Sequence, residues 1–161
     1  TVGNDAYGYS GFGDVFVFIF FGLVAVIGSN FLYSKSMDIK LFLPAIAIGM
    51  LSTAVLNLNN MRDVENDKIS NKNTLVVKKG LKWAKNYHHF LILFSFVCFF
   101  VFSLSVDKKI LPSLIIFIFF LKHLEKVRKS EKHEDFDPEL KKVALGTFAL
   151  SILIGISFLY S

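Results

Sequence analysis

The sequence predicts an all-α membrane protein, a bundle of about five transmembrane helices in one domain of residues 1–161. Two observations support this class. The chain is 53% hydrophobic, with 19 Phe in 161 residues and a mean hydropathy of +0.53, which is too apolar for an ordinary soluble domain. The apolar residues also form five long blocks, and about 20 such residues cross a bilayer core. The blocks are residues 14–33, 41–61, 88–105, 110–124 and 143–161.

Acidic residues mark where these helices are expected to begin. Asp38, Asp107 and Asp137 stand before the second, fourth and fifth blocks, and a carboxylate at this position accepts hydrogen bonds from the first helical turn. Pro138 would then occupy a first helical position, where a missing N–H costs nothing. Asp14, at the start of the first block, is interpreted as a cap as well, and a position facing a cytoplasmic cavity is the alternative.

Small residues inside the blocks predict close helix packing, because helices in lipid associate without a hydrophobic drive and need short side chains to approach. They are Gly22, Gly28, Ala45, Ala47, Gly49, Gly146 and Gly155.

The basic residues predict the orientation. Of the 18 Lys and Arg, 14 fall in residues 62–87 and 122–142, and only four fall in the two other turns. The positive-inside rule therefore places these two loops, and the start of the chain, in the cytoplasm, with Ser161 outside. The net charge of +5 calls for no nucleic-acid partner, since basic cytoplasmic loops and anionic lipid explain it.

The opening "TVGNDAYGYSGFG" has no initiator Met and no basic region, so it is not expected to be a signal peptide. It is typical of a loop between helices, which predicts that the chain is the C-terminal part of a longer protein. The single Cys98 cannot form an intrachain disulfide.

A run of polar residues at the end of the second block is the strongest candidate site. Asn59, Asp63 and Asp67 are spaced i, i+4, i+8, so a continuing helix would align them on one face, roughly 6 Å apart per step. Carboxylate and amide oxygens of this kind bind Mg²⁺, which usually retains waters and phosphate oxygens as further ligands. Glu65 would point away from that face.

Basic residues surround this ladder, and Arg62, Lys68 and Lys72 suit phosphate oxygens. The constellation predicts a diphosphate site. A solvated loop of mixed charge is the simpler alternative, but the asparagines of residues 57–60 begin inside the apolar block, where polar groups are costly and face a cavity or the bundle interior.

These residues resemble a family. The pattern N-x-x-x-D-x-x-x-D followed by K-x-T-L is similar to the second aspartate-rich motif of UbiA-type intramembrane prenyltransferases. "NNMRDVEND", "KNTL" and the upstream "YGYSGFGDVFVFIFFGLVAV" resemble the branch that prenylates 1,4-dihydroxy-2-naphthoate. The residues of the motif are Asn59, Asp63, Asp67, Lys72, Thr74 and Leu75.

The resemblance implies a bundle of about nine spans in the bacterial cytoplasmic membrane, of which this chain supplies roughly the fifth onward. Asp63 and Asp67 would be catalytic Mg²⁺ ligands and Asn59 a supporting ligand. Arg62 and Lys72 would bind the diphosphate or the carboxylate of the aromatic acid. The implied reaction transfers a polyprenyl group from its diphosphate to 1,4-dihydroxy-2-naphthoate with loss of CO₂, giving demethylmenaquinone.

The sequence departs from the family in two places. The first aspartate-rich motif is not found in these 161 residues, which predicts that this chain alone has no transferase activity. Asn71 replaces the usual Gly before the Lys, and Asn tolerates the left-handed backbone that such a turn requires.

Two alternatives stay open. The acceptor could be 4-hydroxybenzoate, homogentisate or a tetrapyrrole, and the chain could instead be a transporter whose acidic helix end binds a cation.

His88 and His89, beside Trp83 and Tyr87, are interpreted as interfacial anchors. "KSEKHEDFD" at residues 129–137 is interpreted as a mixed-charge cytoplasmic loop rather than a metal site.

Overall fold

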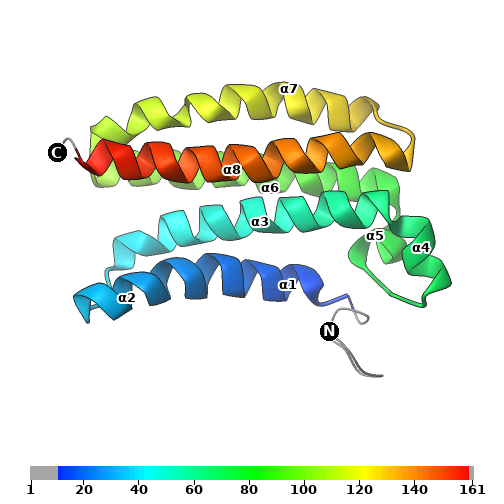
Figure 1. Cartoon of the computed structure of the whole chain (residues 1–161), viewed down its shortest axis with the longest axis horizontal. Coiled ribbons are helices and arrows are strands. Elements are labelled where there is room, and N and C mark those ends of the chain that lie inside the picture. The colour runs from blue at the N-terminus through cyan, green and yellow to red at the C-terminus, as the bar shows by residue number, and fades with distance from the viewer. Residues whose placement is uncertain (1–10, 160–161) are drawn as a thin grey trace.

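The computed structural model describes residues 11–159, which form helices and turns only and run back and forth along one bundle (Figure 1). The helical elements are α1 (Gly13–Val17), π-helical η2 (Phe18–Gly28), α2 (Ser29–Ser34), 3₁₀-helical η3 (Ile39–Leu41), α3 (Phe42–Arg62), α4 (Val64–Ile69), α5 (Leu75–Lys79), α6 (Leu81–Ser105), 3₁₀-helical η4 (Lys108–Ile115), α7 (Ile116–Lys129), 3₁₀-helical η5 (His133–Asp135) and α8 (Phe136–Leu159).

Helix α3 lies at the centre of the described bundle and packs against η2, α6 and α8. Its side chains Leu51, Leu58 and Met61 are completely buried. Burying aliphatic side chains of this size stabilises a fold by roughly 1.5–3 kcal/mol each in water, and in a membrane the same contacts act through close packing. The polar end of α3 is therefore held in place by a helix that neighbouring helices cover on several sides.

The crossing of η2 over α3 depends on small residues, as predicted. A Cβ atom added to Gly22 would lie 2.6 Å from the Cα of Gly49 and 2.6 Å from the carbonyl oxygen of Ala45. Only a residue without a side chain allows the two backbones to approach so closely. Gly155, by contrast, faces open space, so its predicted packing role is wrong within the described part of the chain.

The protein is an integral membrane protein, and the predicted all-α membrane bundle is confirmed. Within residues 11–159, four helical segments are long and apolar enough to cross a membrane: Gly13–Ser34, Ile39–Arg62, Leu81–Ser105 and His133–Leu159. The segment formed by η4 and α7, which contains the fourth predicted block, is not among them. The count of five spans stays a prediction.

Two of the predicted caps are confirmed. Asp38 accepts a hydrogen bond from the backbone N–H of Lys40 at 2.9 Å, and Asp107 accepts one from that of Lys109 at 2.8 Å. Both carboxylates begin short 3₁₀ segments that lead into the longer helices. They satisfy N–H groups that have no partner within the helix.

The other two predicted caps are wrong. Asp137 lies inside α8, which begins at Phe136 after η5, so Pro138 is not at the first helical position. Asp14 lies in the first turn of α1, whose N-cap is Phe12, and no side chain of residues 11–159 caps this helix. Both carboxylates are instead free for contacts with other elements.

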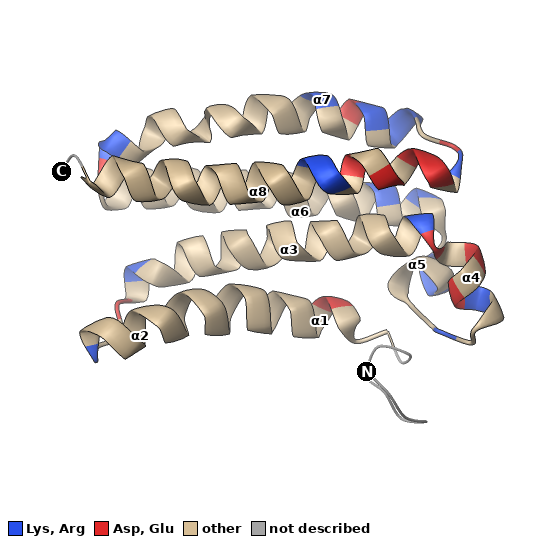
Figure 2. Ribbon diagram, in the orientation of Figure 1, with Lys and Arg blue, Asp and Glu red and all other residues tan. Residues whose placement is uncertain are grey.

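Charged residues concentrate at the end of the bundle where α4 and α5 lie (Figure 2). Both predicted basic loops, residues 62–87 and 122–142, lie at this end. They are more helical than expected, because α6 already begins at Leu81 and α7 continues to Lys129. Lysines on the extra helical turns keep their charged groups in water while their stems cover apolar surface.

A chain of buried polar side chains joins α6, α7 and α8. His88 Nε2 lies 2.7 Å from His123 Nε2, and His123 Nδ1 lies 2.7 Å from Glu139 Oε2. Lys142 Nζ donates to the other oxygen of Glu139 at 2.6 Å. His88 is completely buried, so its predicted role as an interfacial anchor is wrong. His89 is half-buried, and its Nδ1 lies 2.8 Å from the carbonyl oxygen of Lys85.

Candidate functional site

The candidate site begins where α3 ends at a bend. Asp63 has φ −96° and ψ 9°, which interrupts the helix, so the predicted continuous helix through the ladder is wrong in detail. The spacing nevertheless survives. The N–H of Asp63 donates to the carbonyl of Asn59, and the N–H of Asp67 to that of Asp63, both at 2.9 Å. The i, i+4 order of the ladder is therefore kept across the bend.

Arg62 ties the first two residues of the ladder to α8. Its Nε and Nη2 donate to the two carboxylate oxygens of Asp63 at 2.7 and 2.9 Å. Nη2 also donates to Asn59 Oδ1 at 2.8 Å, and Nη1 donates to Asp137 Oδ1 at 2.8 Å. The bidentate contact uses the fork geometry of the guanidinium, which lysine cannot reproduce.

A helix-ending motif places Lys72 over the last residue of the ladder. The N–H of Lys72 donates to the carbonyl of Asp67 at 2.8 Å, and the N–H of Asn71 donates to that of Lys68 at 3.1 Å. This pair of bonds is a Schellman motif, which needs a left-handed residue at the position of Asn71. Asn71 has φ 53°, so the prediction that Asn serves here in place of Gly is confirmed. The turn brings Lys72 Nζ to 3.1 Å from Asp67 Oδ1.

The positive charge of Lys72 acts on both predicted carboxylates, Asp63 and Asp67. Hydrogen bonds from Arg62 hold the pKa of the Asp63 carboxyl below its ordinary value, and the charge of Lys72 lowers this pKa further. Asp67 is buried and pairs directly with Lys72. Glu65 and Lys68 form an exposed ion pair with 2.9 Å between Oε1 and Nζ, and this pair lies away from the candidate site. Of the three predicted cations, Lys68 therefore faces solvent.

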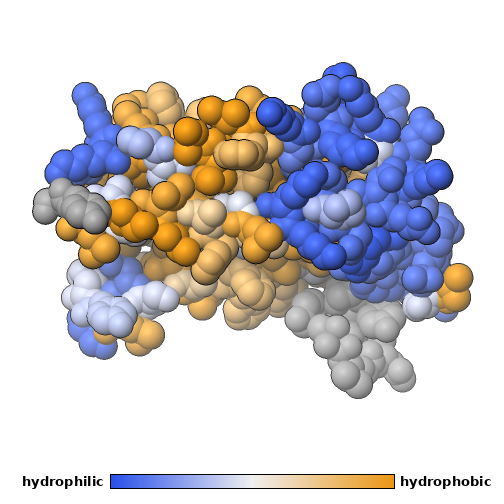
Figure 3. All heavy atoms as spheres, turned by 45° about the horizontal axis from the view of Figure 1, so that its top comes forward, coloured by the Kyte–Doolittle hydropathy of each residue, from blue (hydrophilic) through white to orange (hydrophobic). Residues whose placement is uncertain are grey.

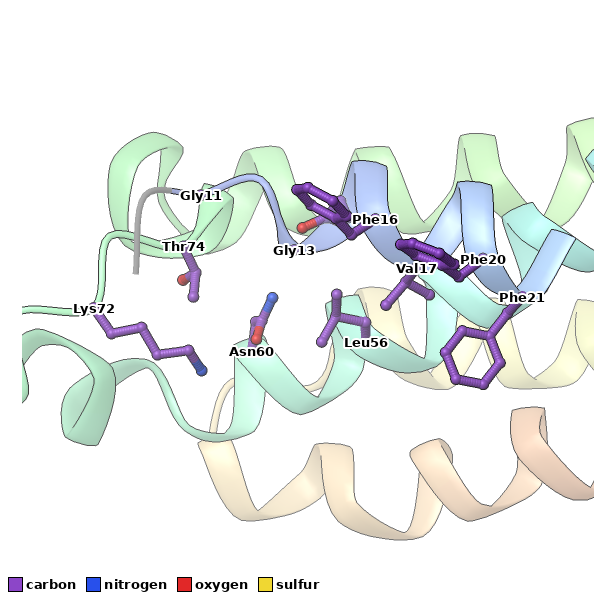
Figure 4. A pocket seen from close by; sticks show the side chains of 11 residues that line it. Gly11, Gly13, Phe16, Val17, Phe20, Phe21, Leu56, Asn60, Lys72 and Thr74 are labelled. Atoms are coloured by element: carbon purple, nitrogen blue, oxygen red, sulfur yellow. The ribbon is translucent and has the colours of Figure 1, made fainter. Parts of the chain in front are cut away.

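A cavity of about 450 Å³ lies beside Lys72, between the start of α1, α3 and the turn before α5 (Figure 4). Its polar end holds Lys72, Thr74, Asn60 and Asp14. Its other side is apolar and is formed by Phe16, Val17, Phe20, Phe21 and Leu56. Gly11 and Gly13 complete the lining.

Three acceptor oxygens in and beside this polar end have no hydrogen-bond partner within residues 11–159. They are Asp14 Oδ1, Asn60 Oδ1 and Asp67 Oδ2, each on a buried residue. Buried oxygens are nearly always satisfied, so a set of acceptors without donors fits a ligand that brings a cation or hydrogen-bond donors. Such hard oxygens suit Mg²⁺. Among residues 11–159, however, no three His, Cys, Asp or Glu side chains converge as a complete metal site.

The structure adds two residues to the predicted set and moves one. Asp14 and Asn60 line the cavity, although the sequence favoured a cap for Asp14 and left the cavity as the alternative, and treated Asn60 as a member of a polar run. Both are polar residues inside apolar blocks, and such residues indicate a side chain that faces a cavity or the bundle interior. Asn59 lines a different cavity of about 570 Å³ between α3 and α8, together with Ser52 and Thr147.

The remaining histidine of interest, His133, lies outside this centre. Its Nδ1 is 3.0 Å from the carbonyl oxygen of Met61, and its Nε2 is 4.0 Å from Glu65. It therefore fastens the turn before α8 onto the end of α3.

Comparisons with known proteins identify the family of the chain. Residues 6–145 match the UbiA prenyltransferase family. The chain is 49% identical to 1,4-dihydroxy-2-naphthoate octaprenyltransferase of Escherichia coli over 104 residues, which cover 65% of this chain and 34% of that protein. It is 35% identical to the Haemophilus influenzae protein of the same name over 161 residues, or 99% and 52% of the two chains.

A more distant relative is UbiA prenyltransferase domain-containing protein 1 of Dictyostelium discoideum, 29% identical over 91% of this chain and 46% of that protein. No solved structure matches the chain. The chain spans about a third to a half of the length of these relatives. The extent of the family match and the similarity to these relatives show that the chain belongs to the UbiA prenyltransferase family.

Proposed function

We propose that the complete protein transfers a polyprenyl group from polyprenyl diphosphate to 1,4-dihydroxy-2-naphthoate with loss of CO₂, giving demethylmenaquinone. The observation that carries this proposal is the cavity with cationic and unpartnered acceptor groups at one end and three Phe side chains at the other. The names of the relatives from E. coli and H. influenzae support the acceptor.

The two parts of an allylic diphosphate match the two ends of this cavity, the diphosphate its polar end and the isoprenoid chain its apolar end. The ammonium of Lys72 is a point charge suited to the diphosphate oxygens, and Thr74 offers a hydroxyl beside it. Phe16, Phe20 and Phe21 offer an apolar, aromatic surface to the isoprenoid chain. Their π faces also favour the positive charge that develops on the allylic carbon.

The unpartnered oxygens of Asp67, Asn60 and Asp14 suit Mg²⁺. We assign Asp63, Asp67 and Asn59 as its candidate ligands, and the oxygens of Asp63 and Asn59 would exchange their hydrogen bonds from Arg62 for the metal. Bound Mg²⁺ supplies Lewis-acid neutralisation of charge on the departing diphosphate. The described residues provide only part of a ligand set. We propose that the first aspartate-rich motif, in a part of the protein outside this chain, provides the rest.

The basic residues of the chain then have separate roles. Lys72 stabilises the diphosphate as the bond between its oxygen and the allylic carbon breaks. The ring of the naphthoate forms the new carbon–carbon bond, and its carboxylate leaves as CO₂. Arg62 is engaged with Asp63, Asn59 and Asp137, so it positions the ladder and reaches a substrate anion only by exchanging one of these acceptors.

We also propose that the end of the bundle that carries this site faces the cytoplasm of a bacterium, because it holds the two basic segments. The relatives named above are prenyltransferases, which favours the enzyme over a transporter. Transfer to 4-hydroxybenzoate, homogentisate or a tetrapyrrole is the alternative within the enzyme class.

The test is transfer activity of the complete protein in lipid or detergent, with each acceptor offered in turn. Asp63→Asn and Asp67→Asn should each lower Mg²⁺-dependent turnover by about 100-fold or more. Glu65→Gln is the matched control, because Glu65 lies on the same helical turn but pairs with Lys68 in solvent, and it should retain activity. Full activity of Asp63→Asn, or turnover by the purified 161-residue chain alone, would contradict the assignment.

A further inference from the structure

A second amphipathic groove lies on α7 and α8, away from the candidate site. It has a volume of about 530 Å³ and is lined at one end by Lys122, His123 and Lys142. The rest of its lining is apolar, from Ile116, Phe119, Phe120, Leu145, Gly146 and Ala149. It shares no lining residue with the cavity beside Lys72.

The two lysines stand at the same height on antiparallel helices. Lys122 lies seven residues before the end of α7 and Lys142 six residues after the start of α8, so each is about 10 Å from the turn that joins the helices. Phe119, Leu145 and Ala149 lie farther from that turn. The groove therefore has its cationic end toward the charged end of the bundle and its apolar end toward the middle.

The cationic end is held in place from inside. Lys142 Nζ donates to buried Glu139, and Glu139 accepts from buried His123 through its other oxygen. An ammonium has three N–H donors, so two remain for a ligand. Lys122 is exposed and has no hydrogen bond or ion pair within residues 11–159. The three side chains Lys122, Lys142 and Glu139 sum to one positive charge, which fits a monoanion.

The flanks of the groove are apolar and exposed. Phe119 is 67% exposed and Leu145 is 68% exposed. Figure 3 shows hydrophobic residues over the middle of the face that carries α7 and hydrophilic residues toward the end where α4 and α5 lie. The lysines thus stand near the change from apolar to polar surface, which is where lipid head groups lie against a membrane protein.

We propose that this groove binds one anionic phospholipid of the membrane, with its phosphodiester between Lys122 and Lys142 and an acyl chain along Phe119, Leu145 and Ala149. Charge complementarity selects this occupant over a neutral lipid, since each lysine near a membrane surface favours an anionic head group by about fivefold. The site is independent of the proposed transferase reaction and needs none of its residues.

The test is native mass spectrometry of the complete protein, released from micelles that contain equal amounts of phosphatidylglycerol and phosphatidylcholine. The wild type should retain one phosphatidylglycerol in preference to phosphatidylcholine. Lys122→Gln/Lys142→Gln should lower that retention by about fivefold for each lysine. Ala149→Trp keeps every charge and fills the apolar part of the groove, so it should lower retention while leaving the fold intact.

Lys126→Gln/Lys129→Gln is the matched control, because both lysines are exposed on α7 but do not line the groove, and it should bind like the wild type. Equal retention of the two lipids by the wild type would overturn the proposal. So would unchanged retention in both groove variants, which would indicate that another part of the protein covers the groove. Displacement of phosphatidylglycerol by farnesyl diphosphate would overturn it in favour of a substrate path.

Discussion

The buried chain formed by His88, His123 and Glu139 allows a stability prediction of defined size. His123 donates from Nδ1 to Glu139 and, as a neutral ring, accepts at Nε2 from the Nε2–H of His88. His123→Leu would remove both bonds and leave two buried groups without these partners. An unsatisfied buried donor costs about 1–3 kcal/mol, and a hydrogen bond to a charged acceptor contributes about 1.5–3 kcal/mol.

The expected loss is therefore at least about 2.5 kcal/mol, or a fall of at least about 5 °C in unfolding temperature. It can be measured on the complete protein in detergent as the temperature at which half of the monodisperse peak disappears from size-exclusion chromatography. His89→Leu is the control, because the side chain of this half-buried neighbour has a hydrogen bond to a backbone carbonyl and no bond to the buried chain in the described residues, and its effect should be within about 1 kcal/mol.

A triple replacement tests the physical reason. Converting His88, His123 and Glu139 together to Leu removes every polar group of the buried chain and leaves Lys142 mostly exposed to water. Replacing a complete buried polar set by apolar side chains is often neutral or stabilising, so the triple variant should recover most of the loss. The reasoning is refuted if His123→Leu is as stable as the wild type, or if the triple variant is less stable than the single one.

Four further predictions follow from particular contacts. Asn71→Val forces a β-branched residue to φ 53° and should cost about 1–2 kcal/mol, whereas Asn71→Gly should cost nothing, as measured by thermal unfolding. Because Arg62 lowers the pKa of Asp63, their pairing stabilises the fold above the ordinary value of 3.8 and is lost as pH falls through the lower folded-state value. Unfolding temperature should thus fall more between about pH 5 and pH 2 in the wild type than in Asp63→Asn, and equal slopes would contradict this. Asp137→Ala removes the α8 partner of Arg62 and should lower kcat/KM of the complete protein about tenfold. An unchanged kcat/KM would show that this contact has no positioning role. Gly22→Val places a Cβ against backbone and should prevent the close crossing of η2 and α3, so normal yield and stability would speak against that contact.

The sequence predicted the membrane class and the motif because both depend on local patterns. Apolar blocks reveal helices, and the ladder of Asn59, Asp63 and Asp67 keeps its spacing because the backbone hydrogen bonds continue across the bend. The left-handed turn at Asn71 was predictable for the same reason, since a residue type and its neighbours determine it.

Contacts between distant segments could not be predicted in this way. Asp14 and Asn60 meet at one cavity although 45 residues separate them, and His88 reaches His123 from another helix. Helices that are apolar all round give no periodic signal for the face each presents to a neighbour. A polar residue inside an apolar block marks a buried contact, but its partner becomes known only when the helices are placed.

The most direct test of the proposed site is the binding of a polyprenyl diphosphate to the complete protein. A thiodiphosphate analogue that resists reaction can be titrated by calorimetry with and without Mg²⁺. If Asp63 and Asp67 hold the metal beside Lys72, Mg²⁺ should strengthen binding in the wild type, and Asp67→Asn should abolish that Mg²⁺ dependence while Glu65→Gln preserves it. Binding that ignores Mg²⁺, or that keeps its full Mg²⁺ dependence in Asp67→Asn, would contradict the account.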